Sequence, residues 1–440
     1  MGARRKLHLN VNLLHSGVYP SAWRLPDSRP DAFVDIDHYV RAARVAERGK
    51  LDAIFLADTP AINDRIEYRP FMALEPTIVL ASVAAATTHV GLIATASTSY
   101  NEPYNLARRF ATLDLVSRGR VGWNVVTTAD AAAGRNFGFA EVSEHGARYA
   151  RAREFTEVVH ALWDSWEDDA LLGEKASGRF VDGNKVHAID HRGAHYSVAG
   201  PLTVPRSPQG RPVTVQAGGS EDGRELAAAT ADAVFSLAQT IADGVAYAAD
   251  LRARATRYGR DPGSIVVLPG LATVIGATEA EARQRQDALW ELVPLEYSLA
   301  RLAGTLRIAP ELLDLDEPLP DPLPLPPDAN HTMFTGTVAL ARRDHLTVRQ
   351  LLRALGGGVG HRIIVGTPER IADDIEEWFH SGAADGFNLM PDVLPDGLEA
   401  FVDAVVPILQ RRGLFRRDYE GSTLRDHLGL TKPDPRVSAE

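Results

Sequence analysis

The sequence of 440 residues contains no cysteine, and this absence excludes several kinds of chemistry at once. Disulfide bonds, thiolate nucleophiles, iron–sulfur clusters and cysteine-ligated zinc sites all require that residue. Any catalysis must therefore use oxygen and nitrogen side chains or a bound cofactor.

The sequence also lacks long apolar runs and an excess of positive charge. No stretch reaches the roughly 18 uninterrupted apolar residues of a membrane-spanning helix, and the apolar part of the N-terminal segment is too short for a signal peptide. The 47 basic and 58 acidic residues give a formal net charge of −11, which opposes binding to nucleic acid or to an anionic membrane. We therefore expect a cytoplasmic protein that binds neither.

The sequence does contain a regular alternation of short apolar runs and amphipathic stretches, which is typical of βαβ units in a parallel sheet. The runs predict eight strands, at residues 7–14, 51–57, 90–95, 120–126, 212–217, 233–237, 265–273 and 386–390. Eight is the number that a closed (β/α)8 barrel requires, although an open doubly wound sheet fits the same alternation. We predict an α/β fold of the TIM-like barrel type.

Two intervals interrupt the alternation. Residues 167–211 are rich in glycine, histidine and proline, with a predicted hairpin at 186–198, and residues 300–367 follow a long helix predicted over 279–299. Long irregular segments in a compact domain are often lids or binding loops. We predict one barrel domain at 1–413, in which 300–367 forms a lid hinged at glycines 356–358. Residues 414–440 are expected to form a C-terminal extension that packs as an arm on the same subunit or a neighbour.

In such a barrel the active site lies at the C-terminal ends of the strands, so polar residues there are candidates. Asp58 and Thr95 end the second and third predicted strands, and Asn124 lies in the fourth. A buried amide must be hydrogen-bonded, and a cofactor carbonyl or ring nitrogen is one suitable partner. A helix cap, a small packing residue and a hydrogen bond within the protein are the structural alternatives.

The most specific local pattern is a strand that passes through Gly218, Gly219 and Ser220 directly into a helix. Glycines allow close backbone approach, and the free N–H groups of a helix start bind phosphate. A plain turn capped by Ser220 is the alternative. His145 and Tyr149 share one face at the start of another helix, where a surface histidine is expected unless this helix start faces the same cleft as Ser220.

Histidines recur at intervals of four at His187, His191 and His195. On a helix this spacing would align metal ligands, but the segment 190–193 between them predicts a turn, which removes the common face. We therefore predict no metal site.

Taken together, these segments resemble the bacterial-luciferase-like, flavin-dependent monooxygenases, within them the group of nitrilotriacetate monooxygenase, dibenzothiophene-sulfone monooxygenase and the larger subunit of pristinamycin IIA synthase. The resemblance extends from residue 7 to about residue 430. The matching segments are LDAIFLADT, VGLIATASTSYNEPYNLARRFATLDLVSRGRVGWNVVTT, GRNFGF, RSPQGRPVTVQAGGSEDGRELAA, GHRIIVGTPERIADDIEEWF and GAADGFNLMP.

The resemblance implies a TIM-like barrel that binds FMN at the C-terminal ends of its strands. Carried over by position, the residues near the flavin ring system would be Asp58, Thr95, Asn124 and Thr127. The remaining cofactor-binding residues would be His145, Tyr149, Gly218, Gly219 and Ser220, the last two and Tyr149 being nearest the phosphate. Because an imidazole changes charge near neutral pH, His145 is also the candidate catalytic proton carrier.

The resemblance further implies a two-component FMN-dependent monooxygenase. A separate NAD(P)H-dependent flavin reductase would supply reduced FMN, and one atom of O2 would pass to a small organic substrate. The absence of a GxGxxG dinucleotide fingerprint agrees with a separate reductase. The alternatives are an F420-dependent hydride-transfer oxidoreductase of the same superfamily and a non-catalytic flavin-binding protein.

The substrate-facing residues implied by the resemblance are His15, Tyr19 and Trp23. Two aromatic side chains with few nearby cations favour an apolar or heteroaromatic substrate over a polyanion. We expect a homodimer or a higher homo-oligomer, since dimers are usual among such barrels.

Overall fold

A computed structural model describes residues 5–62, 66–141, 143–325, 331–356 and 360–435. None of the helices within these ranges combines the length and the apolar character needed to cross a membrane.

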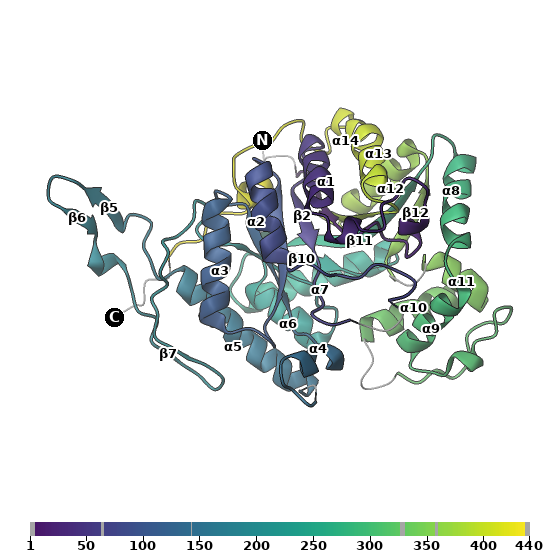
Figure 1. Cartoon of the computed structure of the whole chain (residues 1–440), viewed down its shortest axis with the longest axis horizontal. Coiled ribbons are helices and arrows are strands. Elements are labelled where there is room, and N and C mark those ends of the chain that lie inside the picture. The colour runs from purple at the N-terminus through teal and green to yellow at the C-terminus, as the bar shows by residue number, and fades with distance from the viewer. Residues whose placement is uncertain (1–4, 63–65, 142, 326–330, 357–359, 436–440) are drawn as a thin grey trace.

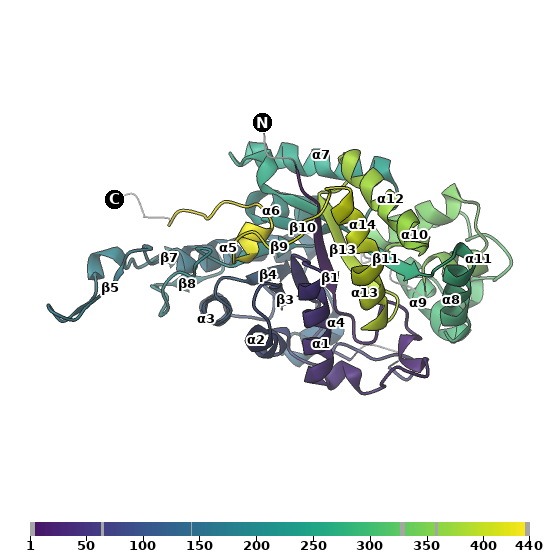
Figure 2. The same ribbon diagram turned by 90° about the horizontal axis from the view of Figure 1, so that it is seen from above.

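Eight parallel strands form a closed barrel surrounded by helices (Figures 1 and 2). Around the ring the order is β1–β2–β3–β4–β9–β10–β11–β13, and β13 pairs with β1. All eight strands predicted from the sequence are confirmed, and the closure between β10 and β11 excludes an open sheet. The strands are β1 (His8–Asn12), β2 (Ala53–Leu56), β3 (Gly91–Ser97), β4 (Val121–Val126), β9 (Val213–Gln216), β10 (Ala233–Ser236), β11 (Val266–Ile275) and β13 (Gly386–Pro391).

On several strands, successive residues belong to different apolar clusters, as the two-residue period of a strand requires. On β2, Ile54 packs with the surrounding helices, whereas Ala53 and Phe55 belong to a cluster inside the barrel. The interior cluster also draws residues from β3, β9, β10 and β11. Polar residues at interior positions of the same strands therefore face the barrel lumen, and Asn10 and Asn12 on β1 occupy such positions.

The helices that cover the barrel begin at side-chain caps in most cases. Asp35 accepts from the N–H of Asp37, and Thr367 accepts from the N–H of Arg370, which satisfies first-turn donors. These outer helices are α1 (Ile36–Arg48), α2 (Pro76–Ala86), α3 (Pro103–Val116), α5 (His145–Trp163), α6 (Glu221–Thr230), α7 (Ile241–Arg257), α12 (Pro368–His380), α13 (Asp396–Ala400) and α14 (Val406–Arg411). The short α4 (Ala131–Asn136) follows β4.

The prediction of a single helix over 279–299 is wrong in its length. The structure divides this stretch into α8 (Glu279–Glu291) and α9 (Leu295–Leu306), with Pro294 as the N-cap of α9. Proline has no N–H and clashes with the preceding turn, so the chain changes direction there.

The interval 167–211 forms two small antiparallel hairpins between α5 and β9. The hairpin predicted at 186–198 is confirmed as β7 (His191–Arg192) and β8 (Ser197–Val198). The other, of β5 (Leu171–Glu174) and β6 (Arg179–Val181), extends away from the barrel on the side opposite α9 (Figure 1).

The second interval differs from the expectation at its end. Helices α9, α10 (His331–Arg343) and α11 (Val348–Ala354) share an apolar core of their own, but residues 362–366 are not part of this insertion. They form a ninth strand, β12 (Arg362–Gly366), parallel to Leu271–Ile275 of β11. Strand β11 has ten residues and pairs with β10 only as far as Pro269, so its second half has an open edge that β12 fills. The predicted hinge residues 357–359 lie outside the described residues.

The C-terminal segment crosses the N-terminal end of the barrel in the same subunit. Leu424, at the start of α15 (Leu424–His427), is fully buried within the interior cluster. Arg425 holds the arm by an ion pair of 3.0 Å with Asp232, which precedes β10. The arm closes this end of the barrel.

Candidate functional site

Thr95 on β3 and Asn124 on β4 are paired in register near the C-terminal ends of their strands. The amide Nδ2 of Asn124 donates to Thr95 Oγ1 over 2.8 Å, and both side chains are buried. Asn124 Oδ1 has no hydrogen-bond partner among the described residues. A buried carbonyl without a donor is rare in native structures, so this oxygen fits a donor supplied by a ligand. Thr127 follows β4 directly and is half-buried.

Asp58, two residues after β2, is a half-buried carboxyl. Burial and the nearby charge of Glu75 raise its pKa to about 6, although the N–H of Thr59 and the charge of Arg109 act in the opposite direction. The side chain therefore exchanges between hydrogen-bond donor and acceptor near neutral pH. Such a carboxyl at a strand end is a candidate functional group.

The turn from β9 to α6 is fixed by contacts on both sides. Gly218 N donates to Gln216 Oε1 over 2.7 Å, and the hydroxyl of Tyr247 donates to Gly218 O over 3.0 Å. A Cβ at Gly218 would lie 2.7 Å from the Cα of Gly223, so the turn requires glycine there. Ser220 caps α6 by accepting from the N–H of Gly223 over 3.2 Å. The hydroxyl proton of Ser220 remains available to a ligand at the helix start.

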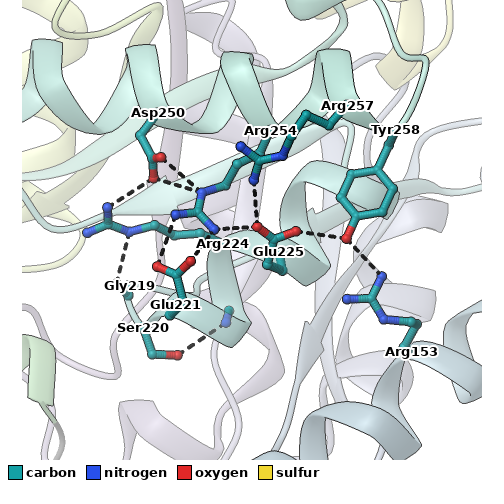
Figure 3. A network of polar contacts seen from close by, with 11 residues as sticks. Arg153, Gly219, Ser220, Glu221, Arg224, Glu225, Asp250, Arg254, Arg257 and Tyr258 are labelled. Atoms are coloured by element: carbon teal, nitrogen blue, oxygen red, sulfur yellow. Dashed lines mark hydrogen bonds and ion pairs between the residues drawn. The ribbon is translucent and has the colours of Figure 1, made fainter.

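A network of charges holds this turn against α7 (Figure 3). Arg254 pairs with Glu221 and Glu225 on α6 and with Asp250 on α7. Arg224 donates to the carbonyl of Gly219 over 3.1 Å and also pairs with Asp250. The acidic side chain of Glu221 in the first turn of α6 is therefore balanced by Arg254. This balance reduces its repulsion of an anion at the same helix start.

His145 lies beside the same turn. Its Nδ1 is 2.9 Å from Asp222 Oδ2, two residues after Ser220, and its ring centre is 4.8 Å from that of Tyr149. The start of α5 thus lies beside the start of α6, with its contact two residues from Ser220. His145 contacts the turn rather than the pair Thr95–Asn124, and its side chain is 48% exposed.

The three residues expected to face the substrate have different surroundings in the structure. His15 is buried in a left-handed backbone conformation, and its Nε2 has no partner within the described ranges. Burial lowers its pKa to about 3, with the charges of Arg69 and His38 acting in the same direction, so the ring is neutral. Trp23 donates to the carbonyl of Tyr68 over 3.1 Å. Tyr19 is fully buried.

Tyr19 packs among side chains of β11 and α8, and its hydroxyl accepts from Gln286 over 3.3 Å. The structure therefore places Tyr19 in the core between these elements. An aromatic residue in a loop gives no sequence signal that distinguishes the two situations.

Sequence reasoning missed an aromatic row across the barrel. The rings of Phe55 on β2 and Phe235 on β10 are 5.8 Å apart, and Phe235 stacks on His361 at 5.1 Å. Since β2 and β10 lie on opposite sides of the ring, this row crosses the lumen. A Cβ at Gly270 would be 2.4 Å from His361 Nδ1, so this glycine leaves space for the imidazole.

The repeated histidines contact separate carboxylates: His187 is 2.8 Å from Glu167, and His191 is 3.1 Å from Glu154. No group of three or more histidine, aspartate and glutamate side chains in the described part of the chain could hold a metal ion.

Comparison with known proteins agrees with this geometry. The model of the luciferase-like monooxygenase family matches residues 18–385. Nitrilotriacetate monooxygenase component A of Aminobacter aminovorans is 47% identical, over 100% of this chain and 99% of that protein. Dibenzothiophene-sulfone monooxygenase of Rhodococcus erythropolis is 43% identical, over 98% of both chains. The structure of EDTA monooxygenase from Chelativorans sp. BNC1 superposes with a TM-score of 0.84 at 39% identity, over 97% of this chain and 99% of that chain.

The barrel and these relatives thus define a flavin-dependent monooxygenase. The chain belongs to the luciferase-like monooxygenase family, which confirms the resemblance found in the sequence.

Proposed function

We propose that the protein is the oxygenating component of a two-component system and uses reduced FMN and O2 to insert one oxygen atom into a small organic substrate. The observation that carries this proposal is the placement of His145 beside the Gly218–Ser220 turn, at the same barrel end as the unpartnered Asn124 Oδ1. A phosphate site and a flavin-ring site at one barrel end fit a mononucleotide.

We assign the phosphate of FMN to the turn after β9. The N–H groups at the start of α6 and the hydroxyl of Ser220 would donate to it, as at other helix starts that bind phosphate. With Nδ1 held by Asp222, His145 has Nε2 left for the same phosphate, and Tyr149 lies beside it. We therefore assign His145 to phosphate binding and no longer to proton transfer at the flavin ring.

The flavin ring would lie against Asp58, Thr95, Asn124 and Thr127. Asn124 Nδ2 is fixed by Thr95, which orients the free Oδ1 toward a ring donor, and Asp58 presents a carboxyl that donates or accepts. Bound FMN supplies the redox chemistry. The chain orients it, hydrogen-bonds to it and excludes water.

The separate reductase rests on two observations. The related nitrilotriacetate enzyme is called component A, and the present sequence lacks a GxGxxG fingerprint for a nicotinamide dinucleotide. We propose that an NAD(P)H-dependent flavin reductase provides the reduced FMN by diffusion.

The decisive experiment is an anaerobic titration of the protein with reduced FMN and, separately, with reduced F420, followed by admission of air. Tight binding of reduced FMN and rapid oxidation on aeration are expected. Tight F420 binding without reaction with air would instead identify a hydride-transfer enzyme. FMN binding without consumption of O2 with any oxidisable substrate would identify a flavin-binding protein.

We also propose that the insertion of α9, α10 and α11 acts as a lid, because it has its own apolar core and lies at one side of the barrel (Figure 1). Loosening that core by Phe334→Ala should leave FMN affinity unchanged and increase the hydrogen peroxide released per NAD(P)H consumed. Equal peroxide release in the variant and the wild type would contradict the lid.

A further inference from the structure

The barrel wall changes its strand pairing where β10 ends. Strand β10 pairs with β11 only as far as Pro269, and β12 pairs with β11 from Leu271 onward. His361, directly before β12, fills the place between these two pairings, because its Nδ1 would lie 2.4 Å from a Cβ at Gly270. Gly270 is two residues after Leu268, which belongs to the interior cluster. The imidazole therefore stands on the lumen side of the wall.

Packing alone does not explain why residue 361 is a histidine. Its ring stacks on Phe235 at an interplanar angle of 9°, a contact that a phenylalanine would make equally well. Nδ1 is buried and has no hydrogen-bond partner among the described residues. Burial lowers the pKa of His361 to about 4, so the ring is neutral and has one donor and one acceptor nitrogen. The residue as a whole is half-buried, so part of it is open to solvent.

Two asparagines beside this imidazole also lack partners. Asn388 on β13 is paired in register with Gly270 of β11 on one side and with Asn10 of β1 on the other. The residues that flank both asparagines pack with the surrounding helices, so the asparagines face the lumen. Both amide atoms of Asn388 and Oδ1 of Asn10 are buried without a partner within the described ranges. Polar groups without partners thus lie side by side on β1, on β13 and at Gly270.

These groups are suited to bind water. Buried polar groups in native proteins are nearly always paired with protein or with ordered water, and a buried water bonds to two to four such groups. Thr95, which we assign to the flavin ring, is two residues after Ile93 of the interior cluster and so faces the same lumen. Water held at Asn388 therefore lies in the same lumen as the flavin site.

The proposed reaction needs a proton at a site that excludes bulk water. Anionic reduced FMN, O2, the substrate and one proton give FMN, the oxygenated product and water. Without substrate, the same reduced flavin, O2 and one proton give FMN and hydrogen peroxide. The arm closes the N-terminal end of the barrel, whereas His361 has a buried nitrogen at the lumen and a part open to solvent.

We propose that Asn10 and Asn388 hold water in the lumen, and that His361 relays a proton from solvent through the barrel wall to this water and so to the flavin site. In the relay an N–H bond forms at Nε2 while the N–H bond at Nδ1 breaks and its proton passes to the water. The imidazole changes tautomer, its net charge is unchanged, and no electron moves. This inference rests on the proposed function, which supplies the reaction that consumes the proton.

The kinetic test needs no substrate. The FMN-loaded protein is reduced by light without O2 and mixed with aerated buffer in a stopped-flow instrument, where absorbance reports the reoxidation of the flavin. His361→Phe should bind FMN and melt as the wild type does, because its ring also stacks on Phe235, but reoxidation should be at least about tenfold slower. Added imidazole should restore the rate of His361→Ala. Pyrrole should not, because its ring has the same size but its single nitrogen only donates.

A second test concerns the water and uses the flavin-free protein. Nuclear magnetic resonance should show cross-relaxation between water and the side-chain amide protons of Asn388. Asn388→Leu, which replaces the amide by an apolar group of similar size, should slow the reoxidation of bound FMN in the same sense as His361→Phe.

His427→Phe is the matched control, because His427 is also buried with both ring nitrogens unpartnered in the part of the chain that the structure describes, but belongs to α15 in the arm. Its reoxidation rate should equal that of the wild type. The inference is overturned if folded His361→Phe or Asn388→Leu keeps the wild-type rate, if pyrrole restores His361→Ala as well as imidazole does, if His427→Phe is slowed equally, or if Asn388 shows no contact with water. Failure of the wild type to bind reduced FMN would instead overturn the proposed function.

Discussion

His145 on α5 and Asp222 on α6 are separated by 77 residues in the chain and are joined by a contact of 2.9 Å between Nδ1 and Oδ2. This contact brings the start of one helix to the start of another. With Arg254 balancing Glu221 on the same helix, the place suits a dianionic phosphate.

A substitution at Ser220 can test phosphate binding while the helix cap is kept. Ser220→Asp keeps a good N-cap but adds a negative charge where we place the phosphate. FMN affinity should fall by at least about tenfold, since like charges repel strongly at close range, while riboflavin affinity and thermal stability should change little. Flavin fluorescence quenching measures the two affinities, and a melting curve measures the thermal stability. An equal loss for FMN and riboflavin would place Ser220 elsewhere in the site.

His145→Asn tests whether this residue serves the phosphate or the chemistry. We expect weaker binding of FMN than of riboflavin and an unchanged pH profile of oxygenation at saturating FMN. His187→Asn is the control, because His187 pairs with Glu167 in the interval between α5 and β9. A shifted pH profile in His145→Asn would restore the proton-transfer role.

The raised pKa of Asp58 predicts that the stability of the protein depends on pH. Its pKa is about 6 in the folded protein and near 3.9 when unfolded, so the folded state holds the proton more tightly. The free energy of unfolding of the flavin-free protein should therefore decrease as pH rises from about 4 to about 6. Asp58→Asn should remove this part of the decrease. Urea denaturation at several pH values measures it, and identical slopes in both proteins would contradict the assignment.

Leu424 should be important for stability although it is distant from the active site. Its side chain fills the N-terminal end of the lumen, where a Cβ at Gly91 would lie 2.5 Å from its Cδ1. Leu424→Ala should destabilise the protein by about 2–5 kcal/mol, as buried leucine truncations do. The exposed Leu312→Ala is the control. A loss below about 1 kcal/mol for Leu424→Ala would show that the arm does not close the barrel in solution.

The projecting hairpin offers a test of the expected oligomer. Leu171 on β5 and Phe180 on β6 are 53% and 72% exposed, and exposed apolar side chains on a projecting element are typical of protein interfaces. We propose that the hairpin packs on a second copy of the chain. Phe180→Asp should lower the mass measured by light scattering at micromolar concentration, whereas Lys175→Asp at the hairpin turn should not. A monomeric wild type would contradict the proposal.

Local sequence patterns predicted much of the fold because short apolar runs mark buried strands and the amphipathic stretches between them mark the covering helices. The turn at Gly218–Ser220 was also predictable, since glycines followed by a capping serine specify a strand-to-helix turn locally. Strand β12 was missed because its five residues follow a glycine run and lie next to an insertion. Their status as a strand depends on the open edge of β11 and not on their own pattern.

The sequence by itself determined the class of fold, the eight barrel strands and the elements that carry Asp58, Thr95, Asn124 and Ser220. Only the tertiary structure decided that Tyr19 packs in the core, that His145 meets Asp222 and that Arg69 meets Tyr297 across 228 residues of chain. The physical reason is the distance along the chain over which each kind of interaction acts. Periodicity and capping act over a few neighbouring residues, whereas these contacts exist only once the barrel has closed and its loops have met at one end.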